Sequence, residues 1–334
     1  MKYIILTQSL IDGQKLKSDI TECDIAMKDI QCFVKEDIVS SRDLFKDVEY
    51  IFSTWYMPTF TEEEIPVLFP SLKSVFYAAG TVKYFAGPFL RNNIHVFSAE
   101  TANGIPVAEF VAAQVILANK GYFLAQHSYK SIFWGLNFRW SRRYAISHCG
   151  NYGAKIGLIG LGAVGRQVAK FLQSYRLSVF AYDPYVDDSV FAELGVKRKD
   201  IREIFVECDV ISNHLPDIPS TKGMLDFKLF SQMKDNVTFI NTGRGAQVVE
   251  RDLAKALRKR KRACAVLDVT RHEPLFPWSP LLRNTKVFIT PHIAGSLANE
   301  GRRLSDVMIR AYKDFIVGKS NEFEVVLSQL SNKA

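Results

Sequence analysis

The sequence predicts an α/β protein built on parallel β-sheets, and two observations carry that prediction. Short runs rich in β-branched and aromatic residues alternate with longer runs of helical periodicity along the chain. This alternation is typical of parallel strands covered by helices. The length of 334 residues indicates roughly two domains at about 150 residues per domain. We therefore expect two α/β units.

The composition excludes several classes of protein. Hydrophobic residues make up 48% and charged residues 23% of the chain, which excludes a wholly disordered or collagen-like protein. The five cysteines are scattered and form no C-x-x-C pair, so we predict neither a disulfide framework nor a metal site. The net charge of +8 is mild for this length and does not by itself imply a nucleic-acid partner.

No segment is expected to cross a membrane. The apolar run at the N-terminus reaches Gln8 at once and is too short for a signal peptide, so it predicts a first strand. The most apolar later run, residues 107–118, is short and carries Glu109 and Gln114, which favours a buried helix. We therefore expect a cytoplasmic protein with no membrane partner.

Strands are expected in two groups, each separated by helical segments. The first group is Tyr3–Thr7, Gln31–Val34, Tyr50–Ser53, Ser74–Ala78 and His95–Ser98. The second group is Lys155–Ile159, Leu177–Tyr182, Val210–Asn213, Thr238–Asn241, Cys264–Asp268 and Val287–Thr290. Helices are expected over 163–175, near 221–234 and 250–262, and over 300–315, where the last helix is placed to return to the first domain.

Residues 121–150 differ from the rest of the chain because they are rich in aromatic residues and arginine. These residues are Tyr122, Phe123, Tyr129, Phe133, Trp134, Phe138, Trp140, Tyr144, Arg139, Arg142 and Arg143. Such a segment between two α/β halves predicts either a packed linker or a contact between subunits, and the composition leaves both open.

The clearest motif is a G-x-G-x-x-G pattern that follows a predicted strand and opens a predicted helix, which is the fingerprint of a dinucleotide site. Gly160 permits a tight turn, Gly162 lets a pyrophosphate approach the backbone, and Gly165 lets the helix pack close to the strand. The amide groups at the start of the helix, around Ala163 and Val164, then face the phosphates.

Asp183 decides which dinucleotide is expected. It ends the next predicted strand, 18 residues after Gly165. Its carboxylate can accept hydrogen bonds from both hydroxyls of the adenosine ribose, whereas a 2′-phosphate would meet a like charge at close range. The sequence therefore predicts NAD rather than NADP. The alternative, a glycine-rich turn that binds no ligand, is less favoured in this strand–turn–helix context.

Three later strand ends place reactive side chains at the same edge of the sheet. An enzyme that transfers a hydride to or from a 2-hydroxy acid needs a cation for the carboxylate, and an arginine fork is suited to it. It also needs an acid–base group, for which histidine is the natural choice, and a carboxylate to hold the tautomer of that histidine. Arg244, His292 and Glu273 supply these three groups.

Other residues of the same strand ends are candidates for cofactor contact. They are His214, Pro216, Thr242 and Gly295. Of the other histidines, three lie far from this edge, and His272 is expected to point away from it. The basic run 258–262 has two interpretations, the cationic end of a helix or a nucleic-acid contact, and we favour the helix end.

Taken in this order, the motifs resemble the NAD-dependent D-isomer-specific 2-hydroxyacid dehydrogenase family. The resemblance is carried by residues 157–165, 214–216, 221–224, 239–245, 267–269, 273–274 and 290–295 and extends from about residue 70 to 315. It implies a Rossmann-type NAD-binding domain, residues 119–299, inserted into a discontinuous flavodoxin-like substrate domain, residues 1–118 and 300–334. It also implies an active site in the cleft between them and a homodimer joined through the arm 121–150.

The resemblance assigns roles to individual residues. Arg244 holds the substrate carboxylate and carbonyl, His292 is the proton donor in reduction, and Glu273 is its partner. Asp268 contacts the nicotinamide carboxamide, and the backbone near Ala79 and Gly80 also holds the carboxylate. The expected reaction is therefore the interconversion of a 2-oxo acid and a D-2-hydroxy acid, by an oxidoreductase acting on CH–OH donors.

The sequence departs from the family pattern in the substrate domain. Lys83 stands where the family commonly has an acidic residue, and the loop containing Trp55, Tyr56 and Met57 is aromatic where relatives have an arginine-containing segment. A phosphorylated substrate needs cations at that loop, so phosphoglycerate is disfavoured. The identity of the acid and the physiological direction stay open. The alternative function is an NADH-sensing, corepressor-like binding protein with weak dehydrogenase activity, since such relatives can keep Arg244, Glu273 and His292.

Overall fold

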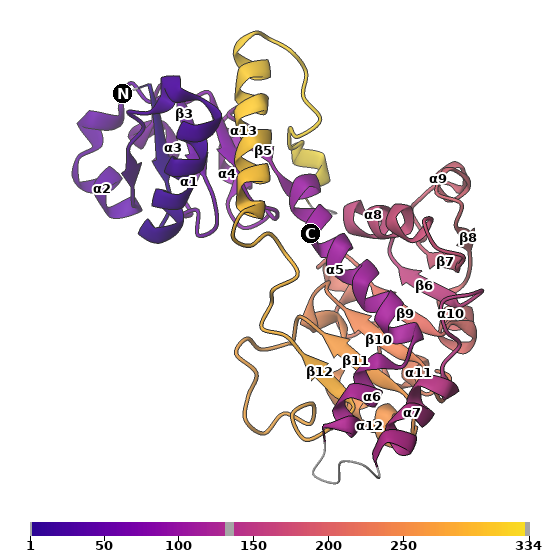
Figure 1. Cartoon of the computed structure of the whole chain (residues 1–334). Coiled ribbons are helices and arrows are strands. Elements are labelled where there is room, and N and C mark those ends of the chain that lie inside the picture. Colours follow the sequence, from indigo (N-terminus) through magenta and orange to yellow (C-terminus); the bar gives the residue numbers. More distant parts are fainter. Residues whose placement is uncertain (1, 131–136, 331–334) are drawn as a thin grey trace. The chain divides into compact units, whose positions relative to one another are not determined.

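The computed structural model describes residues 2–130 and 137–330 and divides the chain into two compact units. Unit 1 comprises Met1–Gly104 and Ser296–Ala334, and unit 2 comprises Ile105–Gly295. Both units are α/β, as predicted (Figure 1). Unit 2 is therefore inserted into the sequence of unit 1.

Within the described residues, unit 1 contains a five-stranded sheet in the order β2-β1-β3-β4-β5, and every neighbouring pair is parallel. This is the flavodoxin-like order that the resemblance implied. The strands are β1 (Tyr3–Leu6), β2 (Cys32–Phe33), β3 (Tyr50–Ser53), β4 (Ser74–Tyr77) and β5 (His95–Ser98). The helices are α1 (Leu10–Cys23), α2 (Lys35–Ser40), α3 (Glu64–Leu68), α4 (Ala86–Arg91) and α13 (Glu300–Ile316).

The sheet of unit 1 is buried on both faces, which explains the unbroken apolar character of its strands. In β1, Ile4 and Leu6 belong to one hydrophobic cluster and Ile5 to the other, because successive side chains point to opposite faces. The second cluster includes Leu304 and Met308 of α13. The final helix therefore returns to the first unit, as the sequence predicted, and lies against α1 (Figure 1).

Unit 2 contains, in the part of the chain that is described, a seven-stranded parallel sheet in the order β12-β11-β10-β9-β6-β7-β8. The chain leaves β6 toward β7 and β8, and then continues on the other side from β9, so the strand order reverses between β6 and β9 as in Rossmann folds. The strands are β6 (Lys155–Ile159), β7 (Ser178–Tyr182), β8 (Lys197–Arg198), β9 (Val210–Asn213), β10 (Thr238–Asn241), β11 (Cys264–Leu267) and β12 (Val287–Ile289). The principal helices are α5 (Glu100–Asn119), α6 (Tyr122–Tyr129), α7 (Asn137–Ser147), α8 (Ala163–Leu172), α9 (Asp188–Glu193), α10 (Ile201–Glu207), α11 (Phe227–Phe230) and α12 (Glu250–Arg258).

The boundary between the units lies within α5, earlier than the predicted change after residue 118. The reason is packing, because Ala108, Val111 and Val115 of this helix belong to the hydrophobic core of unit 2. By length and composition alone α5 is apolar enough to cross a membrane, and 44% of its most apolar window is buried within the protein. The second boundary lies before Ser296 rather than after residue 299.

Two predicted helices of unit 2 are shorter in the structure. Over residues 221–234 the structure has one short α-helix, α11, preceded by a 3-10 turn that ends at Thr221. A longer helix does not form because Gly223 adopts a φ of +65° and Leu225 pairs with Val248 in an isolated bridge. Helix α8 ends at Leu172, before the predicted Tyr175.

The basic run 258–262 lies at the end of α12, as favoured from the sequence. Arg260 donates to the carbonyl oxygens of Ala256 and Met233 at 3.0 and 2.8 Å, and the Lys286 ammonium donates to the carbonyl oxygens of Leu257 and Arg260. The carbonyls of Ala256 and Leu257 lie in the last turn of α12 and are among the acceptors that a helix C-terminus leaves without intrahelical partners. The cations therefore cap the helix.

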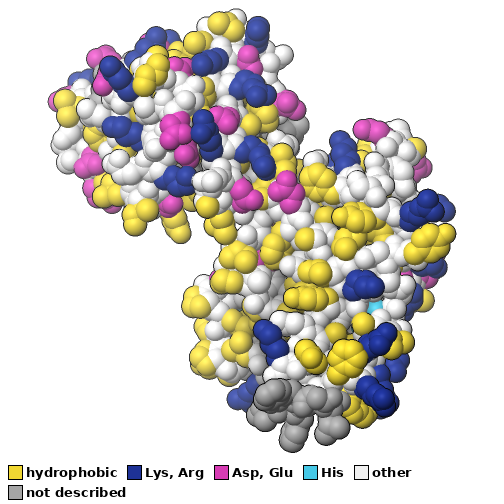
Figure 2. All heavy atoms as spheres, in the orientation of Figure 1, with side chains coloured by type: hydrophobic (Ala, Val, Ile, Leu, Met, Phe, Trp, Pro, Cys, Tyr) yellow, Lys and Arg dark blue, Asp and Glu magenta, His cyan; other side chains and the backbone are white. Residues whose placement is uncertain are grey.

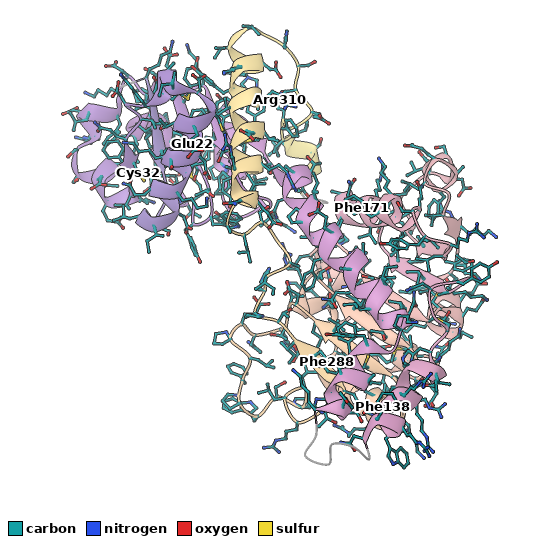
Figure 3. The ribbon with its side chains drawn as sticks, in the orientation of Figure 1. Glu22, Cys32, Phe138, Phe171, Phe288 and Arg310 are labelled. Atoms are coloured by element: carbon teal, nitrogen blue, oxygen red, sulfur yellow. The ribbon has the colours of Figure 1, made fainter. Side chains whose placement is uncertain are left out.

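The aromatic segment 121–150 is partly packed and partly exposed, and residues 131–136, including Phe133 and Trp134, lie outside the described residues. Phe123 of α6 packs against Phe288 of β12 with ring centroids 5.4 Å apart. Phe288 is labelled in Figure 3. On α7, Phe138 and Trp140 are mostly exposed. Hydrophobic and basic side chains lie side by side on this part of unit 2 (Figure 2).

Candidate active site

The glycine-rich loop between β6 and α8 has the geometry that a dinucleotide requires. Gly160 adopts a φ of +99°, and a Cβ on Gly165 would lie 2.1 Å from the carbonyl oxygen of Gly160, so both positions need glycine. At Gly162, by contrast, an added Cβ would meet no atom within 4 Å. The first amides of α8, at Ala163 and Val164, have no side-chain cap and remain available as donors to a phosphate.

Asp183 is fixed against this loop. Its Oδ2 accepts a hydrogen bond from the Leu161 amide at 2.8 Å, and its Oδ1 accepts one from the Tyr185 amide at 2.9 Å. Each carboxylate oxygen keeps a further lone pair for a ribose hydroxyl. Arg198 of β8 contacts the same turn, but it donates to the carbonyl oxygens of Asp183 and Val186 and to the Asp188 carboxylate. The turn therefore fits a ribose diol, and its arginine is already engaged.

The open space at Gly162 allows a clean test of the cradle. Gly162→Ala is expected to leave the melting temperature unchanged, because its Cβ meets no protein atom. NADH affinity, measured by fluorescence titration, is expected to fall by at least about tenfold, because that Cβ occupies the path of the pyrophosphate. Gly301→Ala on α13, where an added Cβ makes only ordinary contacts, is the matched control. An unchanged dissociation constant for Gly162→Ala would contradict the assignment.

The charge of Asp183 is expected to set the preference between dinucleotides. Asp183→Asn keeps an acceptor for the Leu161 amide and removes the negative charge, so the ratio of NADPH to NADH dissociation constants is expected to fall by about tenfold or more. Asp187→Asn, at an exposed aspartate in the same turn, is expected to leave the ratio unchanged. Tighter binding of NADPH than of NADH by the unmodified protein would refute the argument from Asp183.

His214 lies directly beneath the glycine-rich loop. A Cβ on Gly160 would lie 2.7 Å from the His214 carbonyl oxygen, so the two backbones are in close contact. Among the residues that the structure describes, neither ring nitrogen of His214 has a hydrogen-bond partner, and the same is true of the buried Thr242 hydroxyl. Burial lowers the pKa of His214 to about 4. These unpartnered polar groups at the carboxyl ends of β9 and β10 are consistent with the predicted cofactor contacts.

The buried, neutral His214 predicts a loss of stability in acid. The unfolded chain binds a proton at this residue below its ordinary pKa of 6.5, whereas the folded chain resists protonation until about pH 4. The free energy of unfolding in urea is therefore expected to fall by roughly 3 kcal/mol between pH 6.5 and 4 from this group. His214→Phe should reduce that pH dependence, whereas His127→Phe, at an exposed histidine, should not. Equal pH dependence in all three proteins would show that His214 is not the cause.

Arg244 follows β10 and is positioned through its backbone by a buried amide network. Gln247 is fully buried, and its Oε1 accepts hydrogen bonds from the Arg244 amide at 3.1 Å and from Asn213 Nδ2 at 2.5 Å. Its Nε2 donates to the carbonyl oxygens of Leu215 and Pro216. Gln247 thus ties the Arg244 loop to the loop that carries His214 and Pro216.

Residues of this network were not among the sequence predictions. Asn213 and Asn241 each end a buried strand, and Asn213 Nδ2 also donates to Asn241 Oδ1 at 2.9 Å. A signal was present, because polar amides at the ends of otherwise apolar strands need buried partners. The partner Gln247 could not be recognised from the sequence, because it lies in a loop whose side-chain direction depends on the fold.

His292 and Glu273 form the direct contact that the sequence predicted. His292 Nδ1 lies 2.7 Å from Glu273 Oε2, while Glu273 Oε1 accepts a hydrogen bond from the Thr270 amide at 3.1 Å. The backbone of His292 adopts a φ of +55°, and its amide donates to the Asp268 carbonyl oxygen at 3.0 Å. The carboxylate therefore holds one ring nitrogen and leaves Nε2 as the nitrogen that can exchange a proton with a ligand.

The loops that carry Arg244 and Glu273 touch through their backbones. A Cβ on Gly245 would lie 1.9 Å from the Thr270 carbonyl carbon, so only glycine permits this approach. The register of the parallel strands explains the contact, since Asn241 of β10 pairs with Leu267 of β11, and Leu267 pairs with Ile289 of β12. Residues 244, 270 and 292 each come three residues after these paired positions. The three predicted catalytic residues thus leave neighbouring strand ends on one edge of the sheet.

Asp268 fixes the loop that carries His292 through hydrogen bonds. Its buried carboxylate accepts hydrogen bonds from the Thr290 hydroxyl at 2.6 Å and from the amides of Ile293 and Ala294 at 2.8 and 2.9 Å. Three donors to one carboxylate hold the segment that carries His292 in place. The contact of Asp268 with the nicotinamide carboxamide stays a prediction.

The remaining predicted site residues lie in both units. Gly295 is the last residue of unit 2, directly after the loop that Asp268 holds. Ala79 and Gly80 lie in unit 1 after β4, where the Ser98 hydroxyl contacts both carbonyl oxygens, at 3.3 and 2.7 Å. The substrate contact predicted for Ala79 and Gly80 stays a prediction.

Comparisons with known proteins agree with this geometry. Residues 115–294 match the family model described as D-isomer specific 2-hydroxyacid dehydrogenase, NAD binding domain. D-3-phosphoglycerate dehydrogenase of Archaeoglobus fulgidus is 35% identical over 206 residues, which cover 62% of this chain and 38% of that protein. Hydroxypyruvate reductase of Blautia hydrogenotrophica is 34% identical over 166 residues, which cover 50% of this chain and 51% of that protein. The chain thus matches about half or less of the length of these relatives.

Solved structures share the fold over nearly the whole chain. The NAD-complexed D-isomer specific 2-hydroxyacid dehydrogenase of Lactobacillus delbrueckii ssp. bulgaricus superimposes with a TM-score of 0.76 at 20% identity, covering 97% of this chain and 100% of that one. Apo D-mandelate dehydrogenase of Rhodotorula graminis superimposes with a TM-score of 0.77 at 19% identity, covering 97% and 98%. Because the family model covers more than half of the chain and its loop geometry fits the dinucleotide, this protein belongs to the D-isomer specific 2-hydroxyacid dehydrogenase family, and unit 2 is its NAD-binding domain.

Proposed function

We propose that this protein is an NAD(H)-dependent oxidoreductase that interconverts a 2-oxo acid and a D-2-hydroxy acid. The observation that carries the proposal is the 2.7 Å contact between His292 Nδ1 and Glu273 Oε2, on the sheet edge that also presents the Arg244 loop. An imidazole held by a carboxylate is a general acid–base pair, and a guanidinium on the same edge suits a carboxylate substrate.

The residues divide the chemistry between them. The nicotinamide supplies or accepts the hydride when NAD is bound, and the residues that would hold the dinucleotide are those of the glycine-rich loop and Asp183. Arg244 binds the substrate carboxylate through its guanidinium. Protonated His292 gives a proton from Nε2 to the substrate oxygen in reduction, and the neutral ring takes it back in oxidation. Glu273 keeps the Nδ1 proton in place throughout, so that Nε2 always faces the substrate.

A screen of 2-oxo acids tests the proposal. NADH oxidation is followed by the absorbance of the reduced nicotinamide with glyoxylate, hydroxypyruvate, pyruvate and branched 2-oxo acids. The hydroxy-acid products that carry a stereocentre are resolved by chiral chromatography. We expect turnover of at least one acid to the D-hydroxy product. Tight NADH binding without turnover of any acid would reject the proposal in favour of a cofactor-sensing binding protein.

We also propose that the protein forms a homodimer through α6 and α7. The support comes from α7, where the apolar side chains of Phe138, Trp140 and Ile146 are exposed. The same helix carries three arginines. Exposed aromatic residues with arginine are enriched in interfaces. Light scattering should give twice the mass of 37.9 kDa, and Trp140→Glu should shift the protein toward the monomer. A monomeric unmodified protein would refute this proposal.

A further inference from the structure

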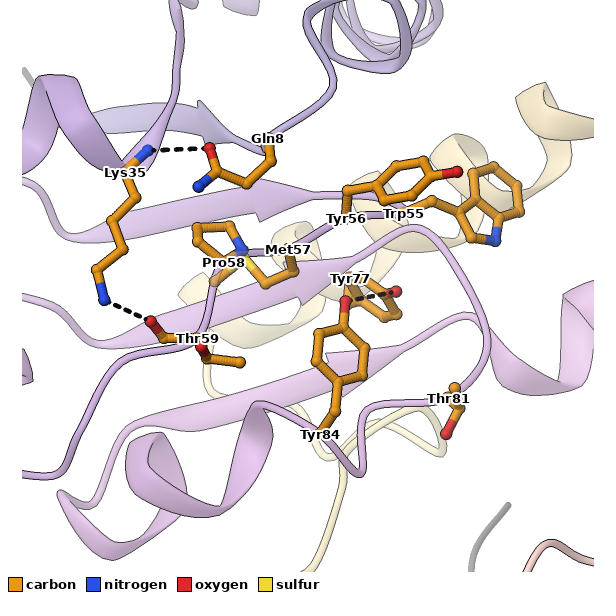
Figure 4. Close-up of a pocket in the computed structure, with 10 residues that line it drawn as sticks. All are labelled: Gln8, Lys35, Trp55, Tyr56, Met57, Pro58, Thr59, Tyr77, Thr81 and Tyr84. Carbon is orange, nitrogen blue, oxygen red and sulfur yellow. Dashed lines mark hydrogen bonds between the residues drawn. The ribbon is translucent and has the colours of Figure 1, made fainter. Parts of the chain in front are cut away.

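Unit 1 has a pocket of its own, at the carboxyl edge of its sheet (Figure 4). Its volume is about 630 Å³, which is enough for an organic ligand. It is lined by Gln8, Lys35, Trp55, Tyr56, Met57, Pro58, Thr59, Tyr77, Thr81 and Tyr84. These residues come from the ends of β1, β2, β3 and β4 and from the loops that follow them. The strand order of unit 1 reverses between β1 and β3, and such a switch point is where open α/β sheets bind ligands.

The loop that forms one wall of the pocket is held in a strained conformation. Tyr56 adopts a φ of +64°, which is rare for a bulky side chain. Two hydrogen bonds from the end of β1 hold it there, from the Gln8 amide to the Tyr56 carbonyl oxygen at 2.9 Å and from the Thr7 hydroxyl to the Trp55 carbonyl oxygen at 2.7 Å. Backbone strain maintained in this way is concentrated at ligand sites. The strained backbone at Tyr56 and the position of the pocket at the switch point of the sheet both indicate ligand binding.

The charge of the pocket is compensated. Among the described residues that line it, Lys35 is the one that carries a charge. The Lys35 ammonium donates to the Thr59 carbonyl oxygen at 2.7 Å, lies 3.3 Å from Glu64 Oε2, and sits over the Phe60 ring at 4.6 Å. Glu64 is itself held by the Thr61 amide at 2.8 Å. A phosphorylated group would therefore meet a cation whose charge Glu64 already balances, and would bury its own charge without full compensation.

Aromatic rings dominate the rest of the lining. Tyr77 is almost fully buried, and its hydroxyl oxygen lies 3.2 Å from that of Tyr84. A dashed line in Figure 4 marks this hydrogen bond. Met57, also buried, and the partly exposed Trp55 complete the apolar wall. Thioether and aromatic side chains pack favourably on an aromatic ring. The lining thus matches an uncharged, flat ligand group.

We propose that this pocket of unit 1 is a binding site for an uncharged aromatic group, and that it selects 2-oxo and 2-hydroxy acids with an aromatic rather than a phosphorylated side chain. The second part rests on the proposed function. A preference for aromatic acids would distinguish this chain from the relatives named D-3-phosphoglycerate dehydrogenase, whose name gives a phosphorylated substrate.

Calorimetry on the full chain saturated with NAD⁺ tests the proposal without turnover, because oxidised cofactor and 2-oxo acid do not react. The ligands are phenylpyruvate, pyruvate and 3-phosphohydroxypyruvate. We expect phenylpyruvate to bind at least about tenfold more tightly than pyruvate, which corresponds to roughly 1.4 kcal/mol. The phosphorylated acid is expected to bind no more tightly than pyruvate. Tightest binding by the phosphorylated acid would overturn the proposal.

Two variants identify the pocket as the source of that preference. Tyr84→Ala removes an aromatic wall at a residue that is 46% exposed, and should weaken phenylpyruvate binding about fivefold or more with little effect on pyruvate. Tyr175→Ala, at a residue 47% exposed in unit 2, is the matched control. Glu64→Gln leaves the Lys35 charge without its partner and should improve binding of the phosphorylated acid, whereas Glu62→Gln, which breaks an ion pair with Arg91 outside the pocket, should not.

The outcomes separate this inference from the proposed function. Turnover of 2-oxo acids with no preference for phenylpyruvate, and no effect of Tyr84→Ala, would overturn the inference and leave the proposed function standing. Binding of phenylpyruvate that Tyr84→Ala weakens, without turnover of any 2-oxo acid, would establish the pocket and reject the proposed function.

Discussion

Replacing His292 with alanine is expected to lower kcat for the reduction of a 2-oxo acid by about 10²- to 10⁴-fold, which is the usual contribution of a positioned acid–base group. The reason is the fixed geometry, since Glu273 holds Nδ1 at 2.7 Å and leaves Nε2 as the proton donor. NADH affinity is expected to change little, because the imidazole is assigned to the substrate oxygen rather than to the dinucleotide. Steady-state kinetics and an NADH titration on the same preparation measure the two effects separately.

Two further variants show whether the effect is specific. His272→Ala removes a neighbouring histidine whose ring centroid lies 4.3 Å from that of Phe276, and this variant is expected to keep nearly full activity. Glu273→Gln keeps the shape of the side chain but loses its charge, and should lower kcat less than His292→Ala does. Full activity of His292→Ala would remove this residue from the mechanism, and equal losses in the two histidine variants would indicate general damage to the loop.

The second large effect is expected at Arg244. Arg244→Met removes the cation that binds the substrate carboxylate, and since each hydrogen bond to a charged group contributes roughly 1.5–3 kcal/mol, losing two should lower kcat/KM by at least about 10²-fold. Arg244→Lys keeps the positive charge but loses the planar guanidinium fork. Its kcat/KM should therefore lie between those of the unmodified protein and Arg244→Met. Steady-state kinetics across a range of 2-oxo acid concentrations gives kcat/KM directly.

The control for Arg244 is Arg251→Met, at an exposed arginine of α12 in the same unit. It changes the net charge equally and is expected to leave kcat/KM unchanged. Circular dichroism and melting temperature should match the unmodified protein in both variants. The Arg244 guanidinium donates to the carbonyl oxygen of the adjacent Gly243, which is a local contact, while Gln247 holds the loop through its backbone. If both arginine variants lost activity equally, a loss of overall positive charge rather than of a carboxylate contact would be the cause.

The parts of the site that the sequence predicted are those whose physical cause is local. Gly160 and Gly165 stand out because a turn with positive φ and a close helix–strand contact leave no room for a side chain. Arg244, Glu273 and His292 follow strands whose apolar character is plain, and parallel strands present their carboxyl ends on one edge. Their proximity was therefore predictable before their side-chain contacts were known.

Other features depend on contacts between distant segments. The helix predicted near 221–234 is largely absent because Leu225 pairs with Val248, a partner that no local pattern reveals. The boundary between the units lies within α5 rather than after residue 118, because Ala108 and Val111 pack into the core of unit 2. At residues 221–234 tertiary pairing outweighed local helical propensity, whereas in α5 the helix is kept and side-chain packing decides to which unit it belongs.

The sequence by itself determined the two α/β units, the dinucleotide loop and the residue types of the acid–base pair, because glycine sterics, strand alternation and motif order act over a few neighbouring positions. Only the tertiary structure decided that Gln247 holds the Arg244 loop, that Glu64 balances Lys35, and that Trp55, Tyr77 and Tyr84 line one pocket. Each of these arrangements joins loops that follow different strands. Their geometry is set by the register and twist of whole sheets, which no single segment encodes.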